Sequence, residues 1–235
     1  MSVKDLDKYF GDFQALADIN IAIQPREFYG CFGPNGAGKT TLLKILTGQL
    51  DYNGGKVNVS GLAVKNSPLE VKRRIGIVPE FESPPSFLTA QEYLYFVGHV
   101  REVNDIETKV KNWMDFFDLW ERGDVLCRDL SKGTRQKLMI AAAVIHQPKL
   151  LFLDEPFINL DPIYQKKVQK YLLDYIKSGG TIFMCTHLLE IAEKLCTRIA
   201  ILDHGRIVGE GDINSLRKKP KEDLSDIFMR LVQSR

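Results

Sequence analysis

The chain has 235 residues, of which 44% are hydrophobic and 26% charged, and its formal net charge is +2. This composition is typical of a folded globular protein, and a charge so near zero gives no support for a polyanionic partner, so we expect no nucleic acid as a partner. No apolar run reaches the roughly 18–20 residues of a membrane-spanning helix, and the N-terminus lacks the features of a secretory signal. The four cysteines lack metal-ligand spacing, and Cys31 and Cys185 lie in apolar strand-like runs, which predicts buried, reduced thiols in a cytosolic protein.

Apolar and polar side chains alternate in the first part of the chain. Residues 1–25 and 54–64 show this pattern, for example in INIAI (19–23) and KVNVS (56–60). Such alternation is typical of antiparallel strands that expose one face to solvent.

Short, continuous apolar runs follow, separated by segments with helical periodicity. Runs of this kind favour parallel strands that are covered on both faces, and their alternation with helices predicts an α/β core. The runs are residues 28–32, 74–79, 149–156, 181–187 and 198–202. Residues 201–211 instead predict an antiparallel hairpin that turns at 203–205.

Residues 81–146 are mostly helical by pattern. Thr89 and Glu92 match a capping box, and Asn104 is a candidate cap for a second helix. Four aromatic residues recur on one face of that second helix: Trp113, Phe116, Phe117 and Trp120. We expect this face to pack in the core, and a groove for a partner helix is the alternative.

A glycine-rich loop, GPNGAGKT (33–40), matches GxxxxGK followed by Thr. It follows a predicted strand and opens a predicted helix, which is the context that this phosphate-binding pattern requires. Gly33, Gly36 and Gly38 lack Cβ atoms, so their backbone N–H groups can converge on an anion. The N-terminus of the following helix adds its positive end. The loop therefore predicts binding of a nucleoside triphosphate.

The end of this loop supplies side chains for the phosphates and for a metal ion. Lys39 would place a cation near the β and γ phosphates, Thr40 would offer a hydroxyl to Mg²⁺, and Thr41 would contact an α phosphate oxygen. The predicted nucleotide-binding set of the loop is Gly33, Pro34, Asn35, Gly36, Ala37, Gly38, Lys39, Thr40 and Thr41.

A second motif, LLFLDEP (150–156), is an apolar strand that ends in two adjacent carboxylates. Neighbouring side chains of a strand point to opposite faces, so the two carboxylates can have different roles. Asp154 would hold Mg²⁺ through water, and Glu155 would face the γ phosphate and polarise the attacking water.

With these two motifs, four further segments make the chain resemble the ATP-binding cassette (ABC) family. LSKGTRQK (130–137) resembles the family signature, NLDP (159–162) its D-loop, and THLLEIAEKL (186–195) its switch histidine and following helix. KYFG (8–11) resembles the segment whose aromatic residue stacks on adenine. The segments occur in the family's order and span nearly the whole chain.

The resemblance assigns further residues to the nucleotide. Phe10 would stack on adenine, with Tyr9 as the alternative ring. Ser131 and Gly133 would contact the γ phosphate of ATP bound by a second subunit, and Ser131 would also cap the signature helix. Asp161 would cap the helix that Pro162 opens and contact that second subunit.

The implied catalytic residues are Lys39, Glu155 and His187, with His187 binding the γ phosphate and orienting the water held by Glu155. Three positions depart from the family pattern, and one of them is Thr134, which stands where the signature usually has glutamine. Glu80 stands where a glutamine usually meets Mg²⁺; it can ligate the metal, but it adds negative charge beside Glu155. Lys132 replaces the first glycine of the signature, as in ABC ATPases that serve multidrug or ABC-2-type exporters.

The resemblance implies a P-loop NTPase (RecA-like) core with a mostly parallel sheet, an N-terminal antiparallel β subdomain and an inserted α-helical subdomain. We expect one ABC ATPase domain over residues 1–235. Its parts are the β subdomain (1–25 and 54–64), the nucleotide-binding core (26–53, 65–80 and 147–215), the helical subdomain (81–146) and a C-terminal tail helix (216–235).

The implied function is ATP hydrolysis with Mg²⁺, in a head-to-tail dimer with an identical or a paralogous ABC subunit. A separate polytopic membrane permease would carry the cargo, and the resemblance to exporter ATPases implies outward transport. This chain would be peripheral on the cytoplasmic face of the cell membrane. Two other functions stay open at this point. One is a soluble ABC ATPase, for example of the iron–sulfur cluster assembly type, and the other is a non-enzymatic nucleotide sensor.

Overall fold

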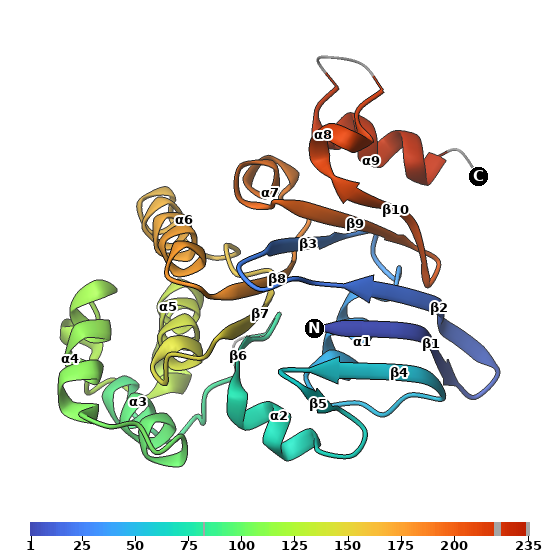
Figure 1. The fold of residues 1–235 in the computed structure, drawn as a ribbon. Helices are drawn as coiled ribbons and strands as arrows, with labels where there is room; N and C mark the ends of the chain where they lie inside the picture. The colour runs from blue at the N-terminus through green and yellow to red at the C-terminus, as the bar shows by residue number, and fades with distance from the viewer. Residues whose placement is uncertain (82, 219–221, 234–235) are drawn as a thin grey trace.

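The computed structural model describes residues 1–81, 83–218 and 222–233, which form two β-sheets with helices around them (Figure 1). The smaller sheet has four strands in the order β2-β1-β4-β5, all antiparallel. Its strands are β1 (Ser2–Phe10), β2 (Phe13–Ala22), β4 (Gly54–Val59) and β5 (Leu62–Ala63). The antiparallel pairing predicted from the alternating segments is confirmed.

The larger sheet has six strands in the order β10-β9-β3-β8-β7-β6. Its strands are β3 (Phe28–Phe32), β6 (Ile75–Val78), β7 (Leu150–Asp154), β8 (Thr181–Cys185), β9 (Arg198–Asp203) and β10 (Arg206–Asp212). All neighbouring pairs are parallel except the β9–β10 hairpin. The predicted α/β fold with a mostly parallel sheet is therefore confirmed.

Two strands are shorter than predicted. β7 ends at Asp154 and β8 at Cys185, because Glu155 leaves the extended conformation with φ of +50° and the chain after Cys185 turns toward helix α7. Glu155 and His187 consequently lie just beyond the carboxyl ends of two paired parallel strands. This is the edge at which open α/β sheets bind ligands.

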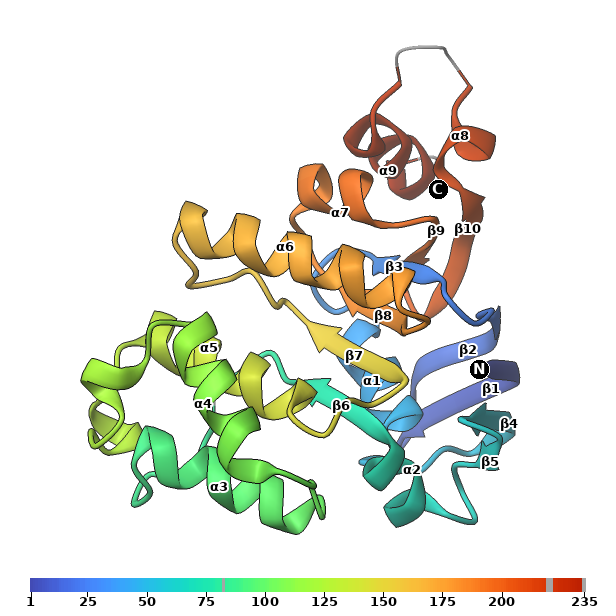
Figure 2. The same ribbon diagram turned by 60° about the vertical axis from the view of Figure 1, so that its left-hand side comes forward.

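The helices follow the predicted alternation. They are α1 (Lys39–Leu46), α2 (Pro68–Arg74), α3 (Ala90–Val100), α4 (Ile106–Phe116), α5 (Lys132–Val144), α6 (Pro162–Lys177), α7 (Leu189–Leu195), α8 (Ile213–Leu216) and α9 (Leu224–Gln233), with 3₁₀ turns at Trp120–Arg122 and Cys127–Asp129. None of these helices is long and apolar enough to cross a membrane. Helices α3, α4 and α5 lie together at one end of the parallel sheet, away from the antiparallel sheet (Figures 1 and 2).

The two faces of the parallel sheet belong to different cores. Phe28 and Phe32 of β3 pack with helices α3 to α7 and α9 in one buried cluster. Tyr29 and Cys31 of the same strand pack with α1, α2 and the antiparallel sheet in a second cluster. This separation follows from the two-residue period of a strand, which is why β3 is apolar throughout.

The observed N-termini of α3 and α4 can be compared with the predicted helix caps. Thr89 and Glu92 form the capping box at the start of α3, as predicted. The prediction for Asn104 is wrong: α4 starts at Ile106, and its N-cap is Asp105, which has φ of +54° and places Asn104 outside the first turn.

The aromatic face of α4 is partly confirmed. Trp113, Phe116 and Phe117 contact one another, and Tyr171 of α6 packs against the first two, so this face is core and not a partner groove. Trp120 does not belong to it. It follows the end of α4, is 47% exposed, and donates a hydrogen bond of 2.6 Å from its indole to Asp115.

All four cysteines are free and buried, as predicted for Cys31 and Cys185. Burial raises the pKa of the Cys127 thiol to about 11 and that of the Cys196 thiol above its usual range. These thiols are therefore protonated near neutral pH and contribute as small apolar groups to the core.

The aromatic centre of the second cluster provides a stability test. Phe183 is fully buried between Tyr29 and Phe152, with ring centroids 5.9 and 5.8 Å away. We expect Phe183→Ala to lower the free energy of unfolding by about 3–5 kcal/mol, measured by urea denaturation. Phe87→Ala, at a side chain that is 73% exposed, should cost less than about 0.5 kcal/mol. Equal losses in the two variants would contradict the assignment of Phe183 to the core.

Candidate active site

The glycine loop between β3 and α1 has a backbone that only glycine accommodates at key positions. A Cβ atom on Gly33 would lie 2.2 Å from the carbonyl oxygen of Leu202. Gly38 has φ of +108°, and a Cβ there would lie 2.9 Å from the carbonyl oxygen of Ala15. The loop is therefore pressed against β9 and β2, and the close approach fixes its conformation.

The turn of the β9–β10 hairpin is hydrogen-bonded to this loop. The N–H group of Gly205 donates to the carbonyl of Ala37 at 3.0 Å, and the N–H group of Ala17 donates to the carbonyl of Gly205 at 2.8 Å. These bonds connect three chain segments that are far apart in the sequence. The loop is consequently held by both sheets.

The start of α1 directs positive charge at the loop. Gly38 is the N-cap and has no side chain to occupy the first N–H groups of the helix, which leaves them for an anion. The Lys39 ammonium donates to the carbonyls of Gly33, at 2.7 Å, and Pro34, at 3.0 Å. Backbone dipole and cation therefore converge on the concave side of the loop.

Carboxylates face the loop from the ends of β6 and β7. Asp154 is 3% exposed, and the Thr40 hydroxyl donates to it at 3.4 Å. Burial, followed by the nearby charges of Glu80 and Glu155, raises the pKa of Asp154 to about 6. Negative charge accumulated in a buried site is stabilised by a bound cation.

The donor set fits Mg²⁺. The described residues contain no group of three or more His, Cys, Asp or Glu side chains arranged as a metal site. Mg²⁺ does not need one, since it is usually bound by one or two carboxylates together with phosphate oxygens and water. A buried Asp154 beside the Thr40 hydroxyl matches that requirement.

The Glu155 side chain is surrounded by donors from the end of β8. One carboxylate oxygen, Oε2, accepts from the Thr186 hydroxyl at 2.8 Å. The other, Oε1, accepts from the backbone N–H and the ring Nδ1 of His187, both at 2.9 Å. Because a carboxylate only accepts, the Nδ1 atom carries the proton. Glu155 and His187, which the sequence placed in one reaction, are thus in direct contact.

The glycine loop, Asp154 and Glu155 line a cavity of about 370 Å³ at the carboxyl edge of the parallel sheet. The predicted residues that it brings together are Phe10, Asn35, Gly36, Ala37, Gly38, Lys39, Thr40, Thr41, Glu80, Asp154 and Glu155. Gly33 and Pro34 belong to the loop but do not line the cavity, and their carbonyls accept from Lys39.

Phe13 also lines the cavity, and sequence reasoning missed it. It pairs with Phe10 across the β1–β2 hairpin, and the two rings are 67% and 48% exposed. The signal was available, because two exposed aromatic residues at the tip of a polar hairpin are unusual for a purely structural turn. Tyr9, the alternative ring, does not line the cavity.

His187 does not line this cavity itself and is joined to it through its hydrogen bonds to Glu155.

Three further predicted residues, at the starts of α5 and α6, also lie outside the cavity. Ser131 caps α5 by accepting from the N–H of Thr134 at 3.1 Å, and Asp161 caps α6, so both predicted caps are confirmed. A Cβ on Gly133 would lie 2.7 Å from the carbonyl oxygen of Asn159, so the signature helix packs closely against the D-loop segment. Within this single chain, none of the three reaches the glycine loop cavity.

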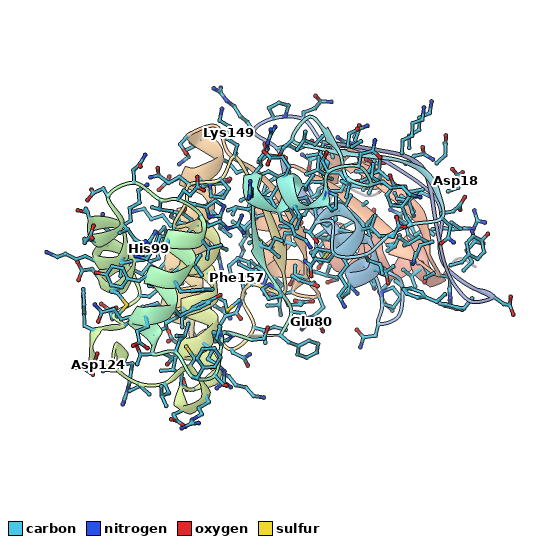
Figure 3. The ribbon with its side chains drawn as sticks, turned by 90° about the horizontal axis from the view of Figure 1, so that it is seen from below. Asp18, Glu80, His99, Asp124, Lys149 and Phe157 are labelled. Atoms are coloured by element: carbon cyan, nitrogen blue, oxygen red, sulfur yellow. The ribbon has the colours of Figure 1, made fainter. Side chains whose placement is uncertain are left out.

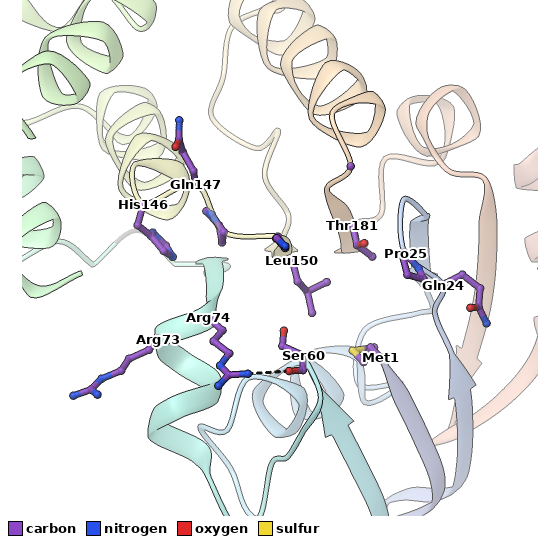
Figure 4. A pocket seen from close by; sticks show the side chains of 13 residues that line it. Met1, Gln24, Pro25, Ser60, Arg73, Arg74, His146, Gln147, Leu150 and Thr181 are labelled. Carbon is purple, nitrogen blue, oxygen red and sulfur yellow. Dashed lines mark hydrogen bonds between the residues drawn. The ribbon is translucent and has the colours of Figure 1, made fainter. Parts of the chain in front are cut away.

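A larger cavity, of about 550 Å³, lies at the opposite edge of the parallel sheet (Figure 4). Arg74, Leu150 and Thr181 line it at the amino ends of β6, β7 and β8, and none of the described residues lines both this cavity and the glycine loop cavity. Figure 3 likewise places Lys149, which lines the larger cavity, far from Glu80. The sequence motifs converge on the smaller cavity, and we therefore assign the chemistry there.

Comparisons with known proteins agree with this geometry. A sequence profile described as "ABC transporter" matches residues 16–158. The chain belongs to the ABC transporter family. It is the ATP-binding cassette of such a transporter, and cassettes of this family hydrolyse ATP, so the chain is an ATPase.

Curated relatives match nearly the whole cassette. It is 32% identical to a Nod factor export ATP-binding protein I of Cupriavidus metallidurans, over 92% of this chain and 72% of that protein. It is 31% identical to the daunorubicin resistance ATP-binding protein DrrA3 of Streptomyces coeruleorubidus, over 98% of this chain and 73% of that protein.

Solved structures share the fold. An ATP-binding subunit of an ABC transporter superimposes with a TM-score of 0.93 at 27% identity, and 98% of each chain is covered. A dimeric ATP-binding cassette in a post-hydrolysis state with ADP and phosphate superimposes with a TM-score of 0.83 at 22% identity, over 90% of this chain and 97% of that one. The expected cassette fold with its P-loop NTPase core is confirmed.

Proposed function

We propose that this cassette hydrolyses Mg²⁺-ATP to drive export through a separate membrane subunit. The observation that carries the proposal is the convergence of the glycine loop, Asp154 and Glu155 on one cavity, with His187 bonded to Glu155. The export direction is supported by the names of the relatives, which describe Nod factor export and daunorubicin resistance.

In this proposal the phosphates bind to the backbone of residues 33–41, and Lys39 lies between the β and γ groups. Mg²⁺ would be held by Thr40, Asp154 and Glu80, and would neutralise charge on the phosphates. Glu155 would polarise the attacking water, with His187 contacting the γ phosphate.

A second ABC subunit, identical or paralogous, would complete each site. Ser131 and Gly133 stand at the N-terminus of α5, outside the chain's own cavity, where they are available to ATP on a partner. Asp161 would contact the same partner. Closure of the two subunits on each other would depend on the γ phosphate, and hydrolysis of ATP would let them separate.

The permease would dock on the cassette next to Glu80, at the cytoplasmic face of the membrane. Phe81, Phe87, Phe96 and Val100 are all at least half exposed on this segment and the following helix. Exposed apolar side chains close together in the chain favour a protein partner. Residue 82, within the proposed docking segment, lies outside the described residues.

We also propose the subdivision stated from the sequence: a β subdomain (1–25 and 54–64), a nucleotide-binding core (26–53, 65–80 and 147–215), a helical subdomain (81–146) and a tail helix (216–235). The described part of the tail contains α9, whereas α8 (Ile213–Leu216) belongs to the core range except for its last residue. Residues 219–221 and 234–235 lie outside the described residues.

The test combines turnover with partner capture. We expect Glu155→Gln to lower Mg²⁺-dependent phosphate release from ATP by about 100-fold or more while ATP still binds, because only the water-activating group is lost. The tagged chain should also co-purify, in stoichiometric amount, with a polytopic membrane protein from detergent-solubilised membranes. Unchanged turnover in the variant would contradict the catalytic role. Turnover without a membrane partner would favour the soluble ABC ATPase.

The two phenylalanines of the β1–β2 hairpin give a second prediction. Phe10→Ala and Phe13→Ala should each raise the Kd for ATP by about 5–100-fold, because stacking on a base contributes roughly 1–3 kcal/mol. Trp120→Ala, at another exposed aromatic residue outside the cavity, is the control. The measurement is a fluorescent-ATP titration. A loss in the Phe10 variant alone would restrict stacking to that ring and remove Phe13 from the site.

Glu80 gives a third prediction. Glu80→Gln should raise the Mg²⁺ concentration for half-maximal ATPase activity about 3–10-fold, because one carboxylate near the ion is lost, while turnover at saturating Mg²⁺ persists. The control is Glu121→Gln, at an exposed position outside the cavity. Superimposable Mg²⁺ titrations for wild type and Glu80→Gln would remove Glu80 from the metal site.

A further inference from the structure

We propose that Thr186 is a positioning residue whose hydroxyl orients the Glu155 carboxylate toward the reacting water. The inference rests on the proposed role of Glu155. It concerns the first residue of the THLLEIAEKL segment (186–195), to which the sequence analysis gave no role.

The contact is short and shielded from solvent. The Thr186 hydroxyl lies 2.8 Å from Glu155 Oε2, and the Thr186 side chain is completely buried. Glu155 itself is 9% exposed, so water competes little for this bond. A hydrogen bond to a charged acceptor in such an environment is stronger than a neutral one in water.

The direction of the bond follows from the other partner of Thr186. Its hydroxyl oxygen accepts from the N–H of Leu188 at 3.1 Å, at the start of the segment that leads into α7. The hydroxyl proton is then directed at Glu155, whose carboxylate offers only acceptors. Thr186 thus links the chain segment between β8 and α7 to the Glu155 carboxylate.

Backbone contacts join the same two segments. The N–H of Glu155 donates to the carbonyl of Cys185 at 2.9 Å, and Glu155 has φ of +50°, a conformation that non-glycine residues adopt only when their surroundings impose it. The bonds from Thr186 and from the backbone N–H of His187 supply that constraint on the side-chain end.

The two side chains that contact Glu155 differ in their freedom to move. The His187 side chain is 59% exposed, whereas that of Thr186 is buried. When the His187 ring turns to the γ phosphate, as the proposed function requires, the Nδ1 bond to Glu155 is lost. The Thr186 bond to Oε2 would stay and would hold the carboxylate in place. Thr186 therefore acts through Glu155 and touches no substrate.

The test uses Thr186→Val, which keeps the shape and removes the hydroxyl, and Thr186→Ser, which keeps the hydroxyl. Thr47→Val is the matched control, since Thr47 is also fully buried but bonds only within and next to its own helix. Steady-state ATPase kinetics at saturating Mg²⁺ give kcat and KM, and thermal melting reports folding of each variant.

For Thr186→Val we expect kcat to fall about tenfold or more with KM for ATP changed less than about twofold, since only the activating group loses its orientation. Thr186→Ser should restore kcat to within about threefold of wild type, and Thr47→Val should leave it unchanged. Equal kcat in the Thr186→Val and Thr47→Val variants would overturn the inference. A loss of kcat that Thr186→Ser does not restore would also overturn it, because it would assign the effect to packing.

Glu155→Gln separates this inference from the proposed function. If Glu155→Gln turns over ATP like wild type, the proposed catalytic role fails. If Glu155→Gln is inactive while Thr186→Val is fully active, the catalytic role stands and only the positioning role of Thr186 fails.

Discussion

The site depends on one constraint, the close backbone approach that fixes the loop between β3 and α1. Gly33 lies against the carbonyl of Leu202, and Gly38 adopts a conformation that side chains disfavour. The turn at Gly205 bonds to Ala37 and to Ala17, so the loop is supported from both sheets. Main-chain N–H groups can bind phosphate strongly only when they are already aligned, because ordering them on binding would cost conformational entropy.

Accumulated negative charge explains why the carboxylate side of the site needs a bound cation. Asp154, Glu155 and Glu80 accumulate negative charge around a small cavity, and the raised pKa of Asp154 reflects burial together with these neighbours. The triphosphate would add more negative charge. Lys39, the N-terminus of α1 and Mg²⁺ are the compensating charges in our proposal. Binding of the nucleotide would therefore be electrostatically coupled to binding of its metal ion.

Much of the fold and of the site could be predicted from the sequence, because each motif lies within one short stretch of the chain. A continuous apolar strand followed by a glycine loop or by paired carboxylates specifies both the element and its functional end. The misses share a cause: Thr186 meets Glu155 across 31 positions, and Phe13 depends on hairpin register, so neither contact has a local pattern. Trp120 was misplaced because helical periodicity does not reveal that Asp118, with φ of +52°, follows the end of α4.

The most direct test of the account is binding of radiolabelled ATP to the purified chain with Mg²⁺, compared with the Lys39→Ala variant. The account predicts that the wild-type chain retains ATP and that the variant loses about 10-fold or more in affinity, because a desolvated cation beside the phosphates is removed. Failure of the wild-type chain to retain ATP, or equal retention by the variant, would contradict it.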